Sequence, residues 1–159
     1  MRLPPLSGDA IRVRFSRLQQ PVHAATLLRK REIVLDAALK DDGPEFVRIL
    51  IHEIFHFAWL RAGNPLRLSY EDLVSREIRA HIPGELGWSA EWRKSALSRR
   101  DVSSRSRRWR EYCCESFCDT AAWIFSGIGR HSEFTLPASE RFRRRRWFKE
   151  SGLTGAIPV

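Results

Sequence analysis

Residues 44–62 read PEFVRILIHEIFHFAWLRA, and this stretch decides how the rest of the chain is interpreted. A proline and acidic residues at 41–45 suit the first turn of a helix, and Gly-Asn-Pro at 63–65 suits its end. Apolar side chains recur on nearly every face between these limits, which is typical of a helix buried in the core. We therefore expect a long central helix that the other elements cover.

The central helix carries two histidines one turn apart, His52 and His56, with the carboxylate of Glu53 beside them. Positions i and i+4 of a helix project from nearly the same face, so both imidazoles can reach one ion. Two nitrogen ligands next to an unbound carboxylate are how zinc hydrolases make hydroxide at neutral pH. The pattern also arises by chance, but buried His and Glu need a partner, which a metal would supply. The sequence thus predicts His52 and His56 as metal ligands and Glu53 as general base.

The composition indicates one globular domain over residues 1–159. The chain is 43% hydrophobic, which is enough for one core and too little for two, and it contains no internal repeat. Three cysteines, an odd number, argue against a disulfide framework and favour a reducing compartment. The start of the chain shows no apolar signal segment, and the longest uncharged apolar run is too short for a membrane span. We expect a cytoplasmic protein without a membrane partner.

The net charge of +9 is unevenly distributed, with +3 in residues 1–80 and +6 in residues 81–159. The C-terminal half is therefore expected to attract polyanions or acidic protein surfaces. Residues 105–110 and a basic tail at 139–159 combine arginines with aromatic residues, which can bind nucleic acid through phosphate contacts and stacking. The candidate residues in the tail are Arg143, Arg144, Arg145 and Arg146. A solvated or core-packed arginine face is the alternative.

The other segments predict an α+β fold with a small N-terminal β-sheet packed on the central helix. Residue patterns predict strands at 11–15, 27–28 and 32–36, and helices at 69–78, 89–97 and 107–125. We expect a loose arm at 1–10, a surface loop at 98–106, and a short helix in the tail capped by Ser139.

A catalytic zinc site needs a third protein ligand, and the second long helix, at 107–125, is expected to supply it. Glu115 is favoured because an unpaired carboxylate is expensive on an apolar helix. Asp119 lies one turn further on the same face and can hold the other N–H of a ligand histidine. The cysteines are expected to be core residues, because neighbours on a helix point about 100° apart. The full set of candidates is Glu115, Glu111, Asp119, His81, His131, Cys113, Cys114 and Cys118.

The pattern His52-Glu53-x-x-His56 followed by Glu115-x-x-x-Asp119 resembles the gluzincin branch of zinc metallopeptidases. The trailing Asp119-Thr120-Ala121-Ala122 is similar to the small ImmA/IrrE-type proteases. The resemblance implies a compact zincin-like domain with one Zn²⁺ per chain, held by two histidines and Glu115, and with Asp119 supporting a histidine. It also implies that an edge strand, expected at 32–36, pairs with the substrate backbone.

Residues 87–92, Gly-Trp-Ser-Ala-Glu-Trp, resemble more weakly the region after the zinc helix in SprT-like proteases, where a histidine supplies the third ligand. Trp88 stands where that histidine would be expected, and His81 is nearby but out of register. The choice between Glu115 and His81 therefore stays open, with Glu115 preferred.

These features predict a zinc-dependent metalloendopeptidase that hydrolyses peptide bonds with metal-activated water and Glu53 as base. The alternatives are a nucleic-acid-binding protein with a catalytically silent zincin fold, a peptidase acting on DNA-associated proteins, and a latent peptidase that needs a partner.

Overall fold

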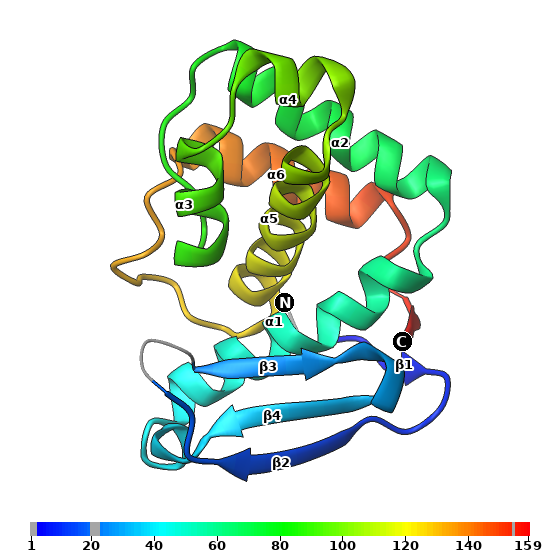
Figure 1. Ribbon diagram of the computed structural model, residues 1–159, viewed down its shortest axis with the longest axis vertical. Coiled ribbons are helices and arrows are strands. Elements are labelled where there is room, and N and C mark those ends of the chain that lie inside the picture. The colour runs from blue at the N-terminus through cyan, green and yellow to red at the C-terminus, as the bar shows by residue number, and fades with distance from the viewer. Residues whose placement is uncertain (1–2, 20–22, 154) are drawn as a thin grey trace.

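The computed structural model describes residues 3–19, 23–153 and 155–159, and it confirms the predicted α+β class. A small sheet lies along one side of a central helix, and the other helices gather on the opposite side (Figure 1). The elements are β1 (Leu6–Ser7), β2 (Arg12–Ser16), β3 (Ala24–Leu27), β4 (Glu32–Asp36), α1 (Gly43–Arg61), α2 (Asn64–Arg79), α3 (Trp88–Ser95), α4 (Arg99–Ser104), α5 (Arg107–Phe125), α6 (Ala138–Glu150) and β5 (Ile157–Pro158).

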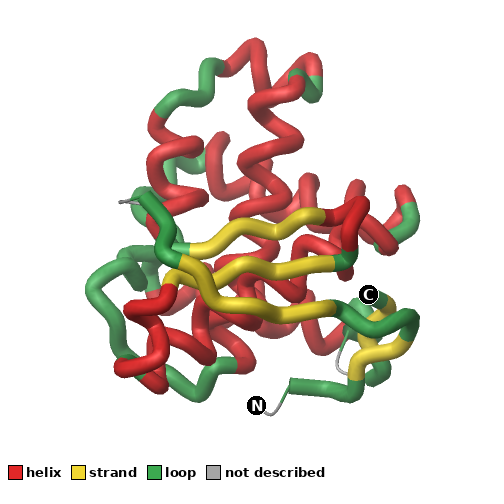
Figure 2. The backbone as a smooth tube through the Cα atoms, turned by 60° about the horizontal axis from the view of Figure 1, so that its bottom comes forward, coloured by secondary structure: helices red, strands yellow, loops and turns green. Residues whose placement is uncertain are grey.

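The main sheet has the order β2-β4-β3, and Figure 2 shows its strands lying over the helices. β4 runs parallel to β2 and antiparallel to β3, and every residue of β4 is buried. The expectation that residues 32–36 form an edge strand was wrong, because β4 has a neighbour on both sides. β3 is the edge strand beside α1, and it begins at Ala24, earlier than predicted, while Leu28 belongs to a short 3-10 turn.

The central helix α1 has nearly the predicted limits. The Asp42 side chain accepts a hydrogen bond from the Glu45 backbone N–H at 3.1 Å, and Pro44 occupies the first turn. Phe55 is completely buried, and its ring centroid lies 5.7 Å from that of Phe117 on α5 and 6.2 Å from that of Phe148 on α6. Aromatic pairs at these separations contribute stability beyond their burial, so they hold α1, α5 and α6 together.

Two predictions about the helices were wrong. α2 begins at Asn64, almost immediately after α1, and not at residue 69 as predicted. Pro65 was interpreted only as the end of α1, but proline also suits the first turn of a new helix. The polar segment at 98–106 forms the helix α4 instead of a loop, because Ser98 and Asp101 form a reciprocal capping box at its start. The prediction for α5 at 107–125 was confirmed, with Ser106 as its N-cap.

The C-terminal basic segment is part of the packed fold. Phe148 of α6 and Ile157 of β5 are completely buried, and β5 pairs in parallel with β1. Leu6 and Ser7 therefore lie in a strand rather than in the loose arm that was predicted. α6 begins after Pro137, so Ser139 is not its cap. None of the helices in the described part of the chain has the length and hydrophobicity that crossing a bilayer requires.

A buried charge network joins α6 to α2 and α5. The Arg144 guanidinium is fully buried and lies 2.6 Å from Glu77 and 2.7 Å from Glu85. The Tyr112 hydroxyl also donates to Glu85, at 2.6 Å. Burial alone would raise the pKa of Glu85, but the charge of Arg144 and its hydrogen bonds hold that pKa below its usual value. Arg144 is therefore a core residue, and its predicted role in nucleic-acid binding was wrong.

Candidate metal centre

The crossing of α1 and α5 brings His52 between two carboxylates. Its Nδ1 lies 2.7 Å from Asp119 Oδ1, and its Nε2 lies 3.3 Å from Glu115 Oε2. The prediction that Glu115 and Asp119 share one helix face directed at the histidines is thus matched by their positions. Both carboxylates come from α5, 63 and 67 residues downstream of His52, so only the tertiary fold unites them.

Asp119 is fixed by groups on both sides. Besides His52, it accepts a hydrogen bond from the Ala90 backbone N–H at 3.1 Å, close to the start of α3. Gly87 lies so close that a Cβ at that position would collide with the Asp119 carboxylate. A carboxylate held in this way sets the orientation and tautomer of an imidazole, and it leaves Nε2 of His52 for a ligand.

The second histidine faces the cysteines of α5. The two imidazole rings have centroids 5.0 Å apart, and His56 Nδ1 lies 3.5 Å from Cys114 Sγ. Among the described residues, one group of three potential ligands has its ligand atoms within 4.8 Å of one another, and it consists of His52, His56 and Cys118. Cys118 was not expected at the site, although its spacing of four from Cys114 places both thiols on one helix face.

Glu53 lies next to the histidines and is held by the sheet. Thr26 of β3 donates its hydroxyl to Glu53 Oε2 at 2.6 Å, so the edge strand orients this carboxylate. Glu53 and His52 both line a cavity of about 280 Å³. Its other lining residues come from β3, α1, α3, α5 and nearby loops, and they are His23, Ala24, Arg48, Ile49, Trp88, Ser89, Trp92, Arg93, Asp119 and Glu133. A larger hollow of about 430 Å³ between α2 and α6 contains no histidine.

The charges at the centre are strongly coupled. Burial would lower the pKa of His52, but the charge of Asp119 and hydrogen bonds with Asp119 and Glu115 raise it well above its ordinary value. Burial would raise the pKa of Glu115, but the hydrogen bond with His52 and the charges of the two histidines and Arg93 lower it to about 2. In Cys114, a hydrogen bond with Cys118 and one with His56 outweigh burial and lower the pKa to about 6. The carboxylates of Asp119 and Glu115 therefore favour positive charge at His52.

The spacing of the ligand atoms fits a zinc ion. Nitrogen and oxygen ligands bind zinc at about 2.0–2.2 Å, so two of them in a tetrahedral set lie about 3.4 Å apart. The 3.3 Å between His52 Nε2 and Glu115 Oε2 agrees with that spacing. Imidazole, carboxylate and thiol are all common zinc ligands, and thiol disfavours magnesium or calcium. Among the described residues, His52, His56 and Cys118 form the group whose ligand atoms lie close enough together to hold such an ion, and Glu115 lies outside that group, 3.3 Å from His52.

The other histidines and acids considered from the sequence lie elsewhere. His81 is exposed at the end of α2 in a left-handed conformation with φ of 54°. His131 Nε2 lies 3.5 Å from Glu45, and the exposed Glu111 is paired with Arg107 at 2.7 Å. None of the three belongs to the group around His52.

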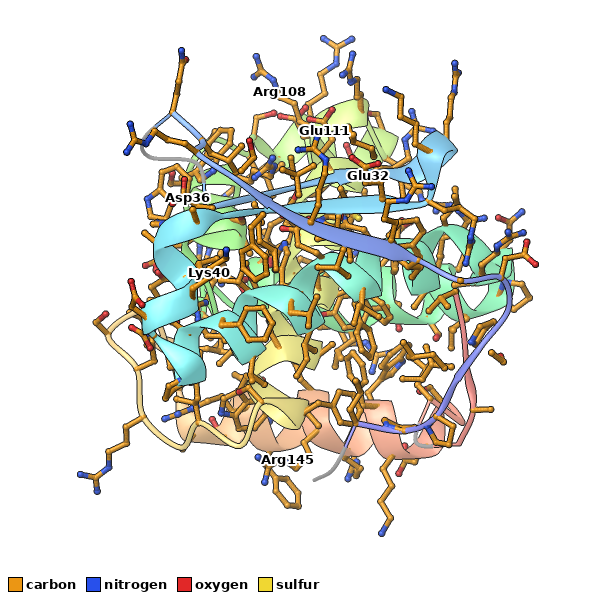
Figure 3. The ribbon with its side chains drawn as sticks, turned by 90° about the horizontal axis from the view of Figure 1, so that it is seen from below. Glu32, Asp36, Lys40, Arg108, Glu111 and Arg145 are labelled. Carbon is orange, nitrogen blue, oxygen red and sulfur yellow. The ribbon has the colours of Figure 1, made fainter. Side chains whose placement is uncertain are left out.

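The exposed arginines of the basic segments lie far apart, and most of them contact a carboxylate or an aromatic ring. Figure 3 shows Arg108 and Arg145 at opposite edges of the molecule, so the two basic segments do not form one patch. On α6, Arg143 lies 2.9 Å from Glu140, and the Arg145 guanidinium lies 4.3 Å from the centroid of the Trp123 ring. These contacts reduce the charge available for phosphate groups, and the nucleic-acid role stays a prediction without structural support.

Comparison with protein-family models, with curated proteins and with solved structures finds no match to this chain. The resemblance to gluzincins therefore stays a prediction.

Proposed function

We propose that the protein is a zinc-dependent metallopeptidase whose centre is formed by His52, His56 and Glu115. The observation that carries the proposal is the position of His52, with Asp119 on one ring nitrogen at 2.7 Å and Glu115 beside the other at 3.3 Å. A histidine oriented by one carboxylate and directed toward a second possible ligand is the arrangement expected of a metal-binding imidazole. A structural ion pair alone would not require a second histidine one turn away.

Bound here, a zinc ion would supply Lewis acidity that lowers the pKa of water and polarises a peptide carbonyl. Glu53 accepts the proton of the attacking water and returns it to the leaving amine. Thr26 fixes one oxygen of the Glu53 carboxylate and so sets the direction in which the other can act. Asp119 keeps His52 in position through its 2.7 Å contact with Nδ1.

The surroundings of Glu53 suit an extended peptide. Among the described residues β3 pairs only with β4, so its outer edge, beside the cavity, can accept the backbone of another strand. Trp88 and Trp92 are 58% and 45% exposed, with ring centroids 6.1 Å apart, and both line the cavity that contains Glu53. Exposed tryptophans at a cavity rim are typical of binding surfaces, so this rim is expected to hold an apolar substrate side chain.

Glu53→Gln is the direct test of the peptidase proposal. The zinc-loaded variant should retain one zinc ion per chain and should lose about 100-fold or more of the rate at which an unfolded protein substrate is cleaved. Glu91→Gln on α3 provides a matched control, since that carboxylate lies outside the group around His52 and contacts Thr135 at 3.1 Å. Equal cleavage by Glu53→Gln and the unaltered protein would exclude Glu53 as the base.

A further inference from the structure

The face that α5 presents to the histidines consists of two parallel lines of ligands. Glu115 and Asp119 are four residues apart and form one line, and Cys114 and Cys118 are also four apart and form the next. His52 contacts the carboxylate line through both ring nitrogens, and His56 contacts the thiol line, with Nδ1 3.5 Å from Cys114 Sγ. The thiols are therefore as much a part of this centre as the carboxylates are.

Cys118 is the thiol that can reach an ion held by both histidines. Its Sγ and a nitrogen of each ring lie within 4.8 Å of one another, and Cys118 is completely buried. Zinc binds sulfur at about 2.3 Å and nitrogen at about 2.0–2.1 Å, so such ligands lie about 3.6 Å apart in a tetrahedral set. A contraction of about 1.2 Å at most brings the observed group to that spacing.

We propose that the Cys118 thiolate is a fourth protein ligand of the ion at His52 and His56, so that the resting centre is closed and the enzyme is latent. The inference rests on the proposed function, and it adds the regulation of the same site. Four protein ligands complete a tetrahedral zinc site, whereas a catalytic site keeps one position for water. Hydrolysis then requires one ligand from α5 to leave.

Glu115 is the ligand suited to leave. Its Oε1 lies 3.4 Å from Nη2 of Arg93, so a second cation is available to this carboxylate when it moves away from the centre. Cys118 has no comparable partner on the surface, because it lies in the buried interior of the fold. Arg93 also lines the cavity that contains Glu53. A substrate that contacts Arg93 can therefore change whether Glu115 pairs with Arg93 or binds the ion.

The experiment uses cobalt(II) loaded into the full chain in three forms: the unaltered protein, Cys118→Ser and Cys113→Ser. Cobalt bound to a thiolate shows an ultraviolet charge-transfer absorption that nitrogen and oxygen ligands do not give. Cys113 is the control, because it is also completely buried on α5 and lies outside the group around the histidines. Thermal unfolding of both variants verifies that each is folded.

The expected result is a thiolate absorption in the unaltered protein and in Cys113→Ser that is absent from Cys118→Ser. The zinc form of Cys118→Ser should cleave an unfolded protein substrate about tenfold faster or more, because a position for water is open. Two results would overturn the assignment of Cys118 as a ligand and leave the peptidase proposal standing. One is cobalt bound to the unaltered protein without the thiolate absorption, and the other is a thiolate absorption that survives in Cys118→Ser. An absorption that is lost in Cys118→Ser, without cleavage by that variant, would support the ligand and overturn the peptidase. Failure of every form to bind cobalt would overturn both.

Discussion

Replacing Asp119 with Asn should weaken zinc binding, since this residue orients His52. Asp119 is only 2% exposed, and its two oxygens accept one hydrogen bond each, from His52 at 2.7 Å and from Ala90 at 3.1 Å. Asn keeps the shape but has one acceptor oxygen and no charge, so it can serve His52 or Ala90 and not both. Loss of such an orienting partner typically lowers metal affinity about 10- to 100-fold, which corresponds to about 1.4–2.7 kcal/mol.

The assay is a competitive zinc titration against a chromophoric chelator, with thermal unfolding as a check on folding. Glu111→Gln is the matched control, because it also neutralises a carboxylate on α5, and its only charged neighbour among the described ion pairs is Arg107. The control should bind zinc like the unaltered protein. Equal zinc affinity of Asp119→Asn and the control would refute the role assigned to Asp119.

Three further predictions concern protons, the core and the substrate. Zinc affinity should fall from pH 8 to pH 6 by about tenfold per pH unit for each proton that zinc displaces, because the raised pKa of His52 favours its protonated form. Glu115, with a pKa of about 2, is ionised throughout this range. A zinc affinity that a chelator titration finds independent of pH would contradict this prediction. Arg144→Met should cost about 3–5 kcal/mol in urea unfolding, because two buried carboxylates lose their partner, and a change below about 1 kcal/mol would be inconsistent with the network. Trp92→Ala should raise KM for peptides with a large apolar side chain severalfold, while Phe142→Ala, 68% exposed on α6, should not, and equal KM values would remove Trp92 from the substrate site.

Parts of the fold were predictable because their signals are local. The acidic residues and Pro44 at the start of α1 and the run of buried side chains defined the central helix. The spacing of Glu115 and Asp119 placed both on one face of α5, and they do meet His52. Helical geometry suffices here, since residues four apart share a face whatever else the chain does.

Other features depend on packing that local patterns do not encode. The strand order, which puts β4 in the centre and β3 at the edge, follows from pairing across the sheet. Arg144 is one of several consecutive arginines, and only the position of Glu77 and Glu85 selects it for burial. The position of Cys118 beside the histidines was not predicted from the angle between adjacent cysteines. Cys114 and Cys118 are four residues apart, so they share the helix face that meets His56.

The metal content of the purified protein shows whether the two histidines of α1 hold a zinc ion. After zinc loading and dialysis, elemental analysis should find one zinc ion per chain in the unaltered protein and less than about a tenth of that in a His52→Ala, His56→Ala double variant that remains folded. A protein without zinc, or zinc that survives the loss of both imidazoles, would contradict the proposal that α1 and α5 together form a metal centre.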